Sequence, residues 1–84
     1  MLTIAVQTPR GTYEGNYLVE RASPTSHSLG FVALLKQVGI VRLDGRYTPL
    51  PVATELRGRW QGRTEREAVE DLTQQFESWA RAQP

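Results

Sequence analysis

The C-terminal third of the chain carries the clearest hydrophobic pattern, because large apolar residues recur there every three or four positions. This spacing places them on one stripe of a helix, with polar residues between them. The four apolar residues are Val69, Leu72, Phe76 and Trp79. Residues 64–67 read Thr-Glu-Arg-Glu, the form of a capping box, in which the first side chain bonds the amide of the fourth residue and the fourth side chain bonds the amide of the first. We expect an amphipathic helix beginning near Thr64.

The N-terminal residues follow a different period, with apolar and less apolar positions alternating over residues 2–7. This alternation predicts a strand with one buried face. Residues 8–11, Thr-Pro-Arg-Gly, predict a turn, and residues 14–16, Glu-Gly-Asn, are a second turn candidate. The return strand is therefore expected within residues 12–21, with its register open.

The middle of the chain is interpreted as a helix followed by a hairpin. Residues 26–38 follow a Ser/Thr-rich cluster, have helical apolar spacing and stop at Gly39, where a C-cap glycine is expected. Asp44-Gly45 then separates two apolar runs and predicts a type I′ hairpin turn. Residues 52–61 are ambiguous between a short helix and a strand, and their alternation favours the strand.

These elements combine into one α+β domain spanning residues 1–84, in the order ββαββ(β)α. The expected architecture is an antiparallel sheet of four to five strands with two helices packed on one face. A chain of 84 residues without cysteine buries a small core and has no disulfides. We therefore expect a homodimer or a larger assembly, since association buries apolar surface that the monomer leaves exposed.

The residue inventory argues against catalysis and metal binding. One histidine and no cysteine cannot form a histidine-based metal cluster or a zinc finger, so no metal or cofactor is expected. A hydrolase or transferase using His27, Ser28 or Glu14 remains a third alternative, without a nucleophile elbow to support it. No signal peptide or membrane-spanning run is recognised, so the sequence predicts a cytoplasmic protein with no membrane contact.

Charge is unevenly distributed although the net charge is only +1. Residues 1–63 hold eight basic and four acidic side chains, whereas residues 64–84 hold two basic and five acidic ones. If residues 52–61 form a strand, alternation directs Arg57, Arg59 and Arg63 to the face opposite Trp60. A polar surface of this kind is also what any exposed sheet face needs.

A nucleic-acid site is one interpretation of this arginine-rich face. Arg42 and Tyr47 are expected to pair across the Asp-Gly hairpin and to share the outward face with the arginines. Such a surface would contact phosphates through its arginines and stack a base on its aromatic ring. The candidate nucleic-acid contacts are Arg42, Tyr47, Arg57, Arg59 and Arg63.

A protein partner is the leading interpretation, because large aromatic residues dominate interfaces between proteins. Phe76 and Trp79 on the C-terminal helix, with Trp60 on the preceding strand, are the candidate partner-binding residues. Core packing is the competing explanation for the helix stripe. The sequence thus favours a small non-catalytic binding or regulatory protein that acts through a partner protein or self-association.

The segment from Leu56 to Leu72 resembles the strand-to-helix junction of HicB-type antitoxin domains, through its pattern Gly-x-Thr-x-x-Glu-Ala-x-x-x-Leu at residues 62–72. Proteins of that family neutralise a toxin and often bind operator DNA. The family helix usually follows soon after the first two strands, whereas residues 24–51 intervene here. The resemblance implies a non-enzymatic regulator with nucleic acid as an alternative partner, and it carries no catalytic residue.

Overall fold

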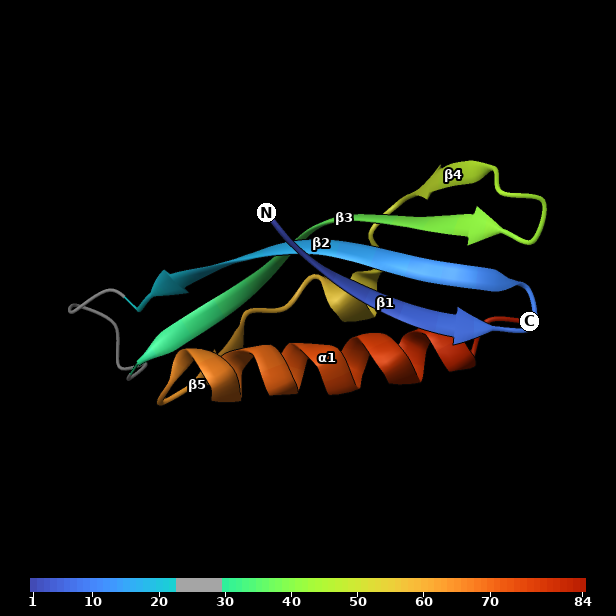
Figure 1. Cartoon of the computed structure of the whole chain (residues 1–84). Coiled ribbons are helices and arrows are strands. Elements are labelled where there is room, and N and C mark those ends of the chain that lie inside the picture. The colour runs from blue at the N-terminus through green and yellow to red at the C-terminus, as the bar shows by residue number, and fades with distance from the viewer. Residues whose placement is uncertain (23–29) are drawn as a thin grey trace.

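The computed structural model describes residues 1–22 and 30–84, which form a five-stranded antiparallel sheet with one α-helix along one of its faces (Figure 1). The elements in chain order are β1 (Leu2–Thr8), β2 (Gly11–Arg21), β3 (Phe31–Arg42), β4 (Tyr47–Leu50), the 3-10 helix η1 (Thr54–Leu56), β5 (Trp60–Gly62) and α1 (Glu65–Arg81). The expected antiparallel sheet of four to five strands is confirmed. The expected second helix and the order ββαββ(β)α are wrong for the described residues.

Strand β3 is the centre of the sheet. One of its edges pairs with β2 over the whole length of both strands, and β2 pairs in turn with β1. The opposite edge of β3 pairs with β5 through residues 31–33 and with β4 through residues 38–41. Strands β4 and β5 therefore follow one another along a single edge of β3, with residues 34–37 between them.

The helix expected at residues 26–38 is replaced by β3 from Phe31 onward, while residues 26–29 lie outside the described part of the chain. The adjacent residues Val32 and Ala33 are both buried, so the apolar residues of β3 do not alternate there and form a continuous run that periodicity does not distinguish from a helix. Gly39 is not a helix cap. It lies within the strand, where an added Cβ would overlap the Tyr47 ring. The glycine therefore makes room for that ring.

The second turn candidate, at residues 14–16, is also wrong, because β2 continues through it without a break. Gly15 faces the helix, and a Cβ added there would lie 3.0 Å from Cε1 of Phe76 and 2.9 Å from Cδ1 of Leu35. Glycine in a strand often marks a close approach of this kind. By contrast, the strand expected at residues 2–7 and the turn at residues 8–11 are confirmed.

The hairpin at Asp44-Gly45 is confirmed, but its turn is longer than the sequence predicts. Arg42 and Arg46 form the last backbone hydrogen bond, so the loop has the three residues 43–45 rather than two. Gly45 has φ of +89° and its amide donates to the Arg42 carbonyl oxygen at 2.8 Å. A type I turn followed by a left-handed residue is the usual three-residue loop. Consequently Tyr47 pairs with Val41 rather than with Arg42.

Residues 52–61 contain little strand. The chain leaves the sheet after β4, forms η1, and rejoins β3 only at β5. Leu56 in η1 is almost completely buried and belongs to the main core, so this side chain draws the connection toward α1. The strand expected at residues 52–61 is therefore wrong for most of its length, because burial of Leu56 takes the chain away from the sheet.

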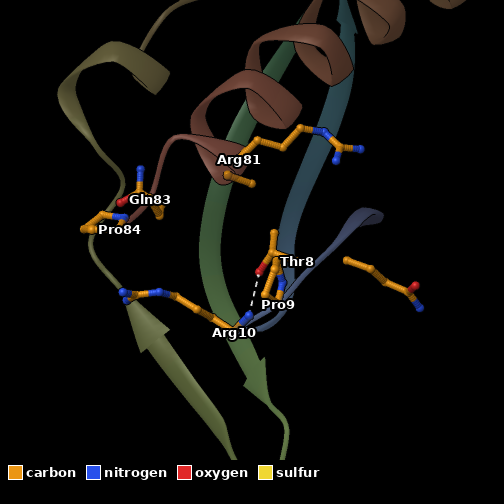
Figure 2. A pocket seen from close by; sticks show the side chains of 8 residues that line it. Thr8, Pro9, Arg10, Arg81, Gln83 and Pro84 are labelled. Atoms are coloured by element: carbon orange, nitrogen blue, oxygen red, sulfur yellow. Dashed lines mark hydrogen bonds between the residues drawn. The ribbon is translucent and has the colours of Figure 1, made fainter.

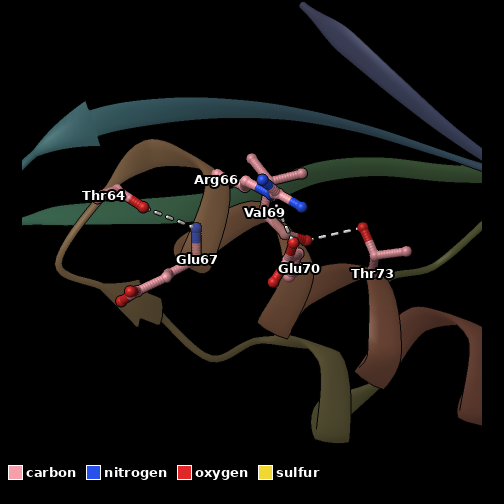
Figure 3. A network of polar contacts seen from close by, with 6 residues as sticks. All are labelled: Thr64, Arg66, Glu67, Val69, Glu70 and Thr73. Carbon is pink, nitrogen blue, oxygen red and sulfur yellow. Dashed lines mark hydrogen bonds and ion pairs between the residues drawn. The ribbon is translucent and has the colours of Figure 1, made fainter.

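Helix α1 begins as the sequence predicts, with Thr64 as its N-cap (Figure 3). The Glu67 amide donates to Thr64 Oγ1 at 3.1 Å. The Glu67 carboxylate accepts from the amide of Arg63 at 2.9 Å, one residue before the donor expected for a capping box. Figure 3 also shows the Arg66–Glu70 ion pair on the exposed side of the helix. The two hydrogen bonds made by Thr64 and Glu67 fix where the helix begins.

The core lies between α1 and one face of the sheet. Its largest fully buried side chains are Phe76, Leu56 and Leu72. The opposite face carries an exposed polar row, in which Thr3 Oγ1 donates to Asn16 Oδ1 at 2.9 Å and Asn16 Nδ2 donates to Gln37 Oε1 at 3.2 Å. The domain is therefore two layers thick, with one sheet face toward solvent. Within the described residues, α1 and η1 are too short or too polar to cross a membrane.

Candidate functional site

The outer edge of β1 is a sheet edge to which no other described strand pairs. None of its seven residues is charged, and none is glycine or proline. Leu2 is 54% exposed and the preceding Met1 is 76% exposed. Sheet proteins usually protect a free edge with charged residues, proline or a covering segment. This strand has no such residue and therefore offers its backbone groups to another strand.

The same edge continues into an apolar notch. Strand β2 extends beyond the beginning of β1, because Leu2 pairs with Tyr17 while β2 runs on to Arg21. A cavity of about 350 Å³ lies there, between the sheet edge and the first turns of α1. Its lining residues are Met1, Leu2, Tyr17, Leu18, Val19, Glu65 and Val69. The notch adds apolar surface to the free edge of β1.

A second surface lies at the opposite edge of the sheet, where no described residue pairs with this edge of β3 between β4 and β5. A cleft of about 410 Å³ occupies this gap. Its lining residues are Leu34, Leu35, Lys36, Pro51, Val52, Arg57, Gly58 and Arg59. Three of these are cations and none is acidic. We refer to this feature as the basic cleft.

A third cavity, of about 460 Å³, lies between the β1–β2 turn and the C-terminal end of α1. Figure 2 shows its two arginines, Arg10 and Arg81, pointing away from each other. Arg81 donates to Glu77 at 3.2 Å, which neutralises its charge. Gln83 is likewise engaged, since its Nε2 donates to the Trp79 carbonyl oxygen at 2.8 Å. The polar groups here do not converge on a common point, so the cavity is the weakest of the three candidates.

The aromatic residues proposed from the sequence as partner contacts lie in or against the core. Phe76 is 0% exposed. Trp79 is partly buried, with its ring 5.3 Å from that of Tyr13 and 5.6 Å from that of Phe76. Trp60 is also partly buried, and its indole Nε1 is a buried nitrogen without a hydrogen-bond partner in the described residues. Packing within the chain accounts for most of their surface.

The residues proposed from the sequence as nucleic-acid contacts do not share one face. Tyr47 lies over Gly39 on the solvent face of the sheet. Arg42 lies on the opposite face, where its Nε donates to Thr48 Oγ1 at 3.4 Å. Arg63 follows β5, at the beginning of the helix. Arg57 and Arg59 precede β5 and are not in a strand, so the alternation assumed for residues 57–63 is wrong.

Arg57 and Arg59 are nevertheless brought together, in the basic cleft, and Lys36 joins them from β3. Lys36 is not among the residues expected from the sequence, because the apolar spacing around it predicts a helix. One signal was available in the sequence. Lys36 and Gln37 interrupt an otherwise apolar run from Phe31 to Val41, as expected where a central strand reaches solvent.

Two arrangements can be checked within the described residues, a metal-binding cluster and a pair of cooperating carboxylates. No group of three or more histidine and acidic side chains is arranged to hold a metal within residues 1–22 and 30–84. Glu14 and Glu20 lie on the same strand, six residues apart and hence roughly 20 Å from one another. This distance is too large for a pair of cooperating carboxylates. His27 and Ser28 lie outside the described residues.

Comparison with known proteins gives no match to a family model, to a curated protein or to a solved structure. The resemblance of residues 56–72 to HicB-type antitoxins therefore rests on the motif alone. The strand-to-helix junction that carries this motif is present, as β5 followed by α1. The free edge of β1 and the basic cleft are the two surfaces of the described residues that are suited to binding.

Proposed function

We propose that the chain is a non-catalytic binding protein that works through protein contacts, and that it associates with a second copy of itself along β1. The observation that supports this function is the uncharged, unpaired edge of β1. Strand addition at such an edge gives affinity through main-chain hydrogen bonds and requires no new fold in the partner. Apolar side chains beside the edge supply further buried surface.

A second copy suits this edge because antiparallel pairing of β1 with itself is symmetric. In a two-fold dimer residue i of one copy meets residue j of the other and j meets i, so only a residue near the axis faces its own copy, and a charge there would oppose itself. Strand β1 carries no charge and therefore meets no such repulsion. Pairing also covers Leu2, and it brings Met1 and the apolar notch near the partner.

The substitution Ala5→Lys tests the proposal. Ala5 is exposed in the middle of β1 and faces Glu14 across the β1–β2 pair, so a lysine there suits the folded monomer. In the dimer the same lysine lies near its copy and costs association energy. We expect the wild-type mass measured by light scattering to rise with protein concentration, and the Ala5→Lys protein to remain monomeric.

The matched control is Gln37→Lys, which adds the same charge to the solvent face of the sheet at β3, away from the β1 edge. This variant should associate as the wild type does. Dissociation by Gln37→Lys would instead show that the open sheet face is the interface. A wild-type chain that stays monomeric at high concentration, yet binds an extended peptide at β1, would assign the edge to a partner protein and contradict self-association.

A further inference from the structure

The basic cleft lies at an interruption of the sheet. On one edge of β3, Leu34, Leu35 and Gln37 pair with β2. On the other edge, pairing with β5 ends at Ala33 and pairing with β4 begins at Val38. The connecting chain turns away toward α1 at this point, because Leu56 enters the core. The resulting opening of about 410 Å³ falls within the usual size range of small-molecule sites, roughly 300–1,000 Å³.

The three cations of the cleft are not neutralised by the described residues. The ion pairs of the described chain are Arg46–Asp44, Arg66–Glu70 and Arg81–Glu77. None of them involves Lys36, Arg57 or Arg59, and no acidic residue lines the cleft. Like charges gathered from two separate segments create a local positive potential that an anion relieves.

Two features position these side chains. Arg57 Nε donates to the Val52 carbonyl oxygen at 3.0 Å, which fixes the guanidinium and leaves its terminal amino groups free for a ligand. Lys36 is the extra residue of a β-bulge, since Asn16 pairs with Gln37 and Tyr17 pairs with Leu35. A bulge reorients side chains and is frequent beside binding sites. The cations therefore do not come from a regular exposed strand face.

We propose that the basic cleft binds the phosphate group of a nucleotide unit, either free or within a single strand. Arginine matches the geometry of phosphate oxygens with two parallel hydrogen bonds, and lysine adds a mobile positive charge. Leu34, Leu35 and Val52 add apolar surface to the cleft, against which the nucleoside lies. This site is on the opposite edge of the sheet from β1 and does not depend on self-association.

The test is a titration of the isotope-labelled chain followed by backbone amide NMR shifts, with inorganic phosphate, a mononucleotide and a short single-stranded oligonucleotide as probes. We expect shifts centred on Lys36 and residues 57–59 with all three probes. Lys36→Gln and Arg59→Gln should each weaken binding about tenfold through loss of a charge-assisted hydrogen bond. For the oligonucleotide, the logarithm of the binding constant falls with the logarithm of the salt concentration, and each variant should make this slope shallower by roughly one unit.

Arg46→Gln is the matched control, because it removes one exposed arginine from the β3–β4 loop, outside the cleft. It should leave binding of all three probes unchanged. Stronger binding of the strand than of the mononucleotide would identify the nucleic-acid backbone as the source of phosphate, and equal binding would identify a free nucleotide. Shifts centred on Arg10 and Arg81, or none at the cleft, would overturn the proposal. The light-scattering mass of Lys36→Gln and Arg59→Gln should match that of the wild type.

Discussion

At the scale of single residues, the contact between Gly15 and Phe76 determines how closely the helix approaches the sheet. A methyl group at Gly15 would lie 3.0 Å from the Phe76 ring and 2.9 Å from Leu35, closer than ordinary van der Waals contact. We expect Gly15→Ala to lower the free energy of unfolding by about 1–3 kcal/mol through overpacking. Urea unfolding followed by circular dichroism measures this loss.

A double-mutant cycle separates overpacking from other effects of the same change. In a Phe76→Leu background the ring is absent, so Gly15→Ala should cost less than it does in the wild type. Equal costs in both backgrounds would show that the glycine is not there to accommodate Phe76. The sequence suggested a turn at Gly15 because nothing local reveals which side chain from the distant helix lies over it.

Thr64 provides a second prediction at this scale. Its hydroxyl accepts from the Glu67 amide at the first turn of α1. Thr64→Ala should reduce the unfolding free energy by about 1 kcal/mol, the usual cost of a lost N-cap. The control is Thr73→Ala, because Thr73 Oγ1 donates to the Val69 carbonyl oxygen within the helix and caps nothing. Its effect should stay within about 0.5 kcal/mol, and equal losses in the two variants would contradict the capping role.

At the scale of elements, the segment from η1 to β5 shapes the basic cleft. Leu56 is 1% exposed and is the residue of η1 that enters the core. We expect Leu56→Ala to cost about 2–5 kcal/mol in thermal or urea unfolding, as for other buried leucines. Val52→Ala, at a partly buried position of the same connection, should cost clearly less. A larger loss for Val52→Ala would show that Leu56 does not hold this connection in place.

The sequence predicts β1, the hairpin at β4 and α1 because their signals are local. Alternation, a turn glycine and a capping threonine each act within a few residues. The run from Phe31 to Val41 has no such signal, because its apolar residues are consecutive rather than alternating and adjacent ones such as Val32 and Ala33 are both buried. The pairing of residues 31–33 with β5 is a long-range contact that composition and spacing do not reveal.

At the scale of the whole molecule, the two candidate surfaces lie on opposite edges of one sheet. The β1 edge is uncharged, whereas the gap on the far side of β3 is lined by cations. The sequence indicated Arg57 and Arg59 as binding residues, but through a strand alternation that the structure does not have. Nothing in the sequence indicated that β1 would be an unpaired edge of the described sheet. Which strand lies at the edge of a sheet depends on the order of all its strands, and this order is set by the fold as a whole.

The central claim is that β1 pairs with a second copy, and amide hydrogen exchange tests it most directly. In a strand at a free edge, the amides that point away from the sheet have no strand to bond, and their hydrogens exchange rapidly with solvent. We expect protection of β1 amides to rise between dilute and concentrated protein, with β4 and α1 unchanged, and to stay low in Ala5→Lys at both concentrations. Unchanged β1 protection in a sample whose mass has increased would contradict the claim, because association would then occur elsewhere on the molecule.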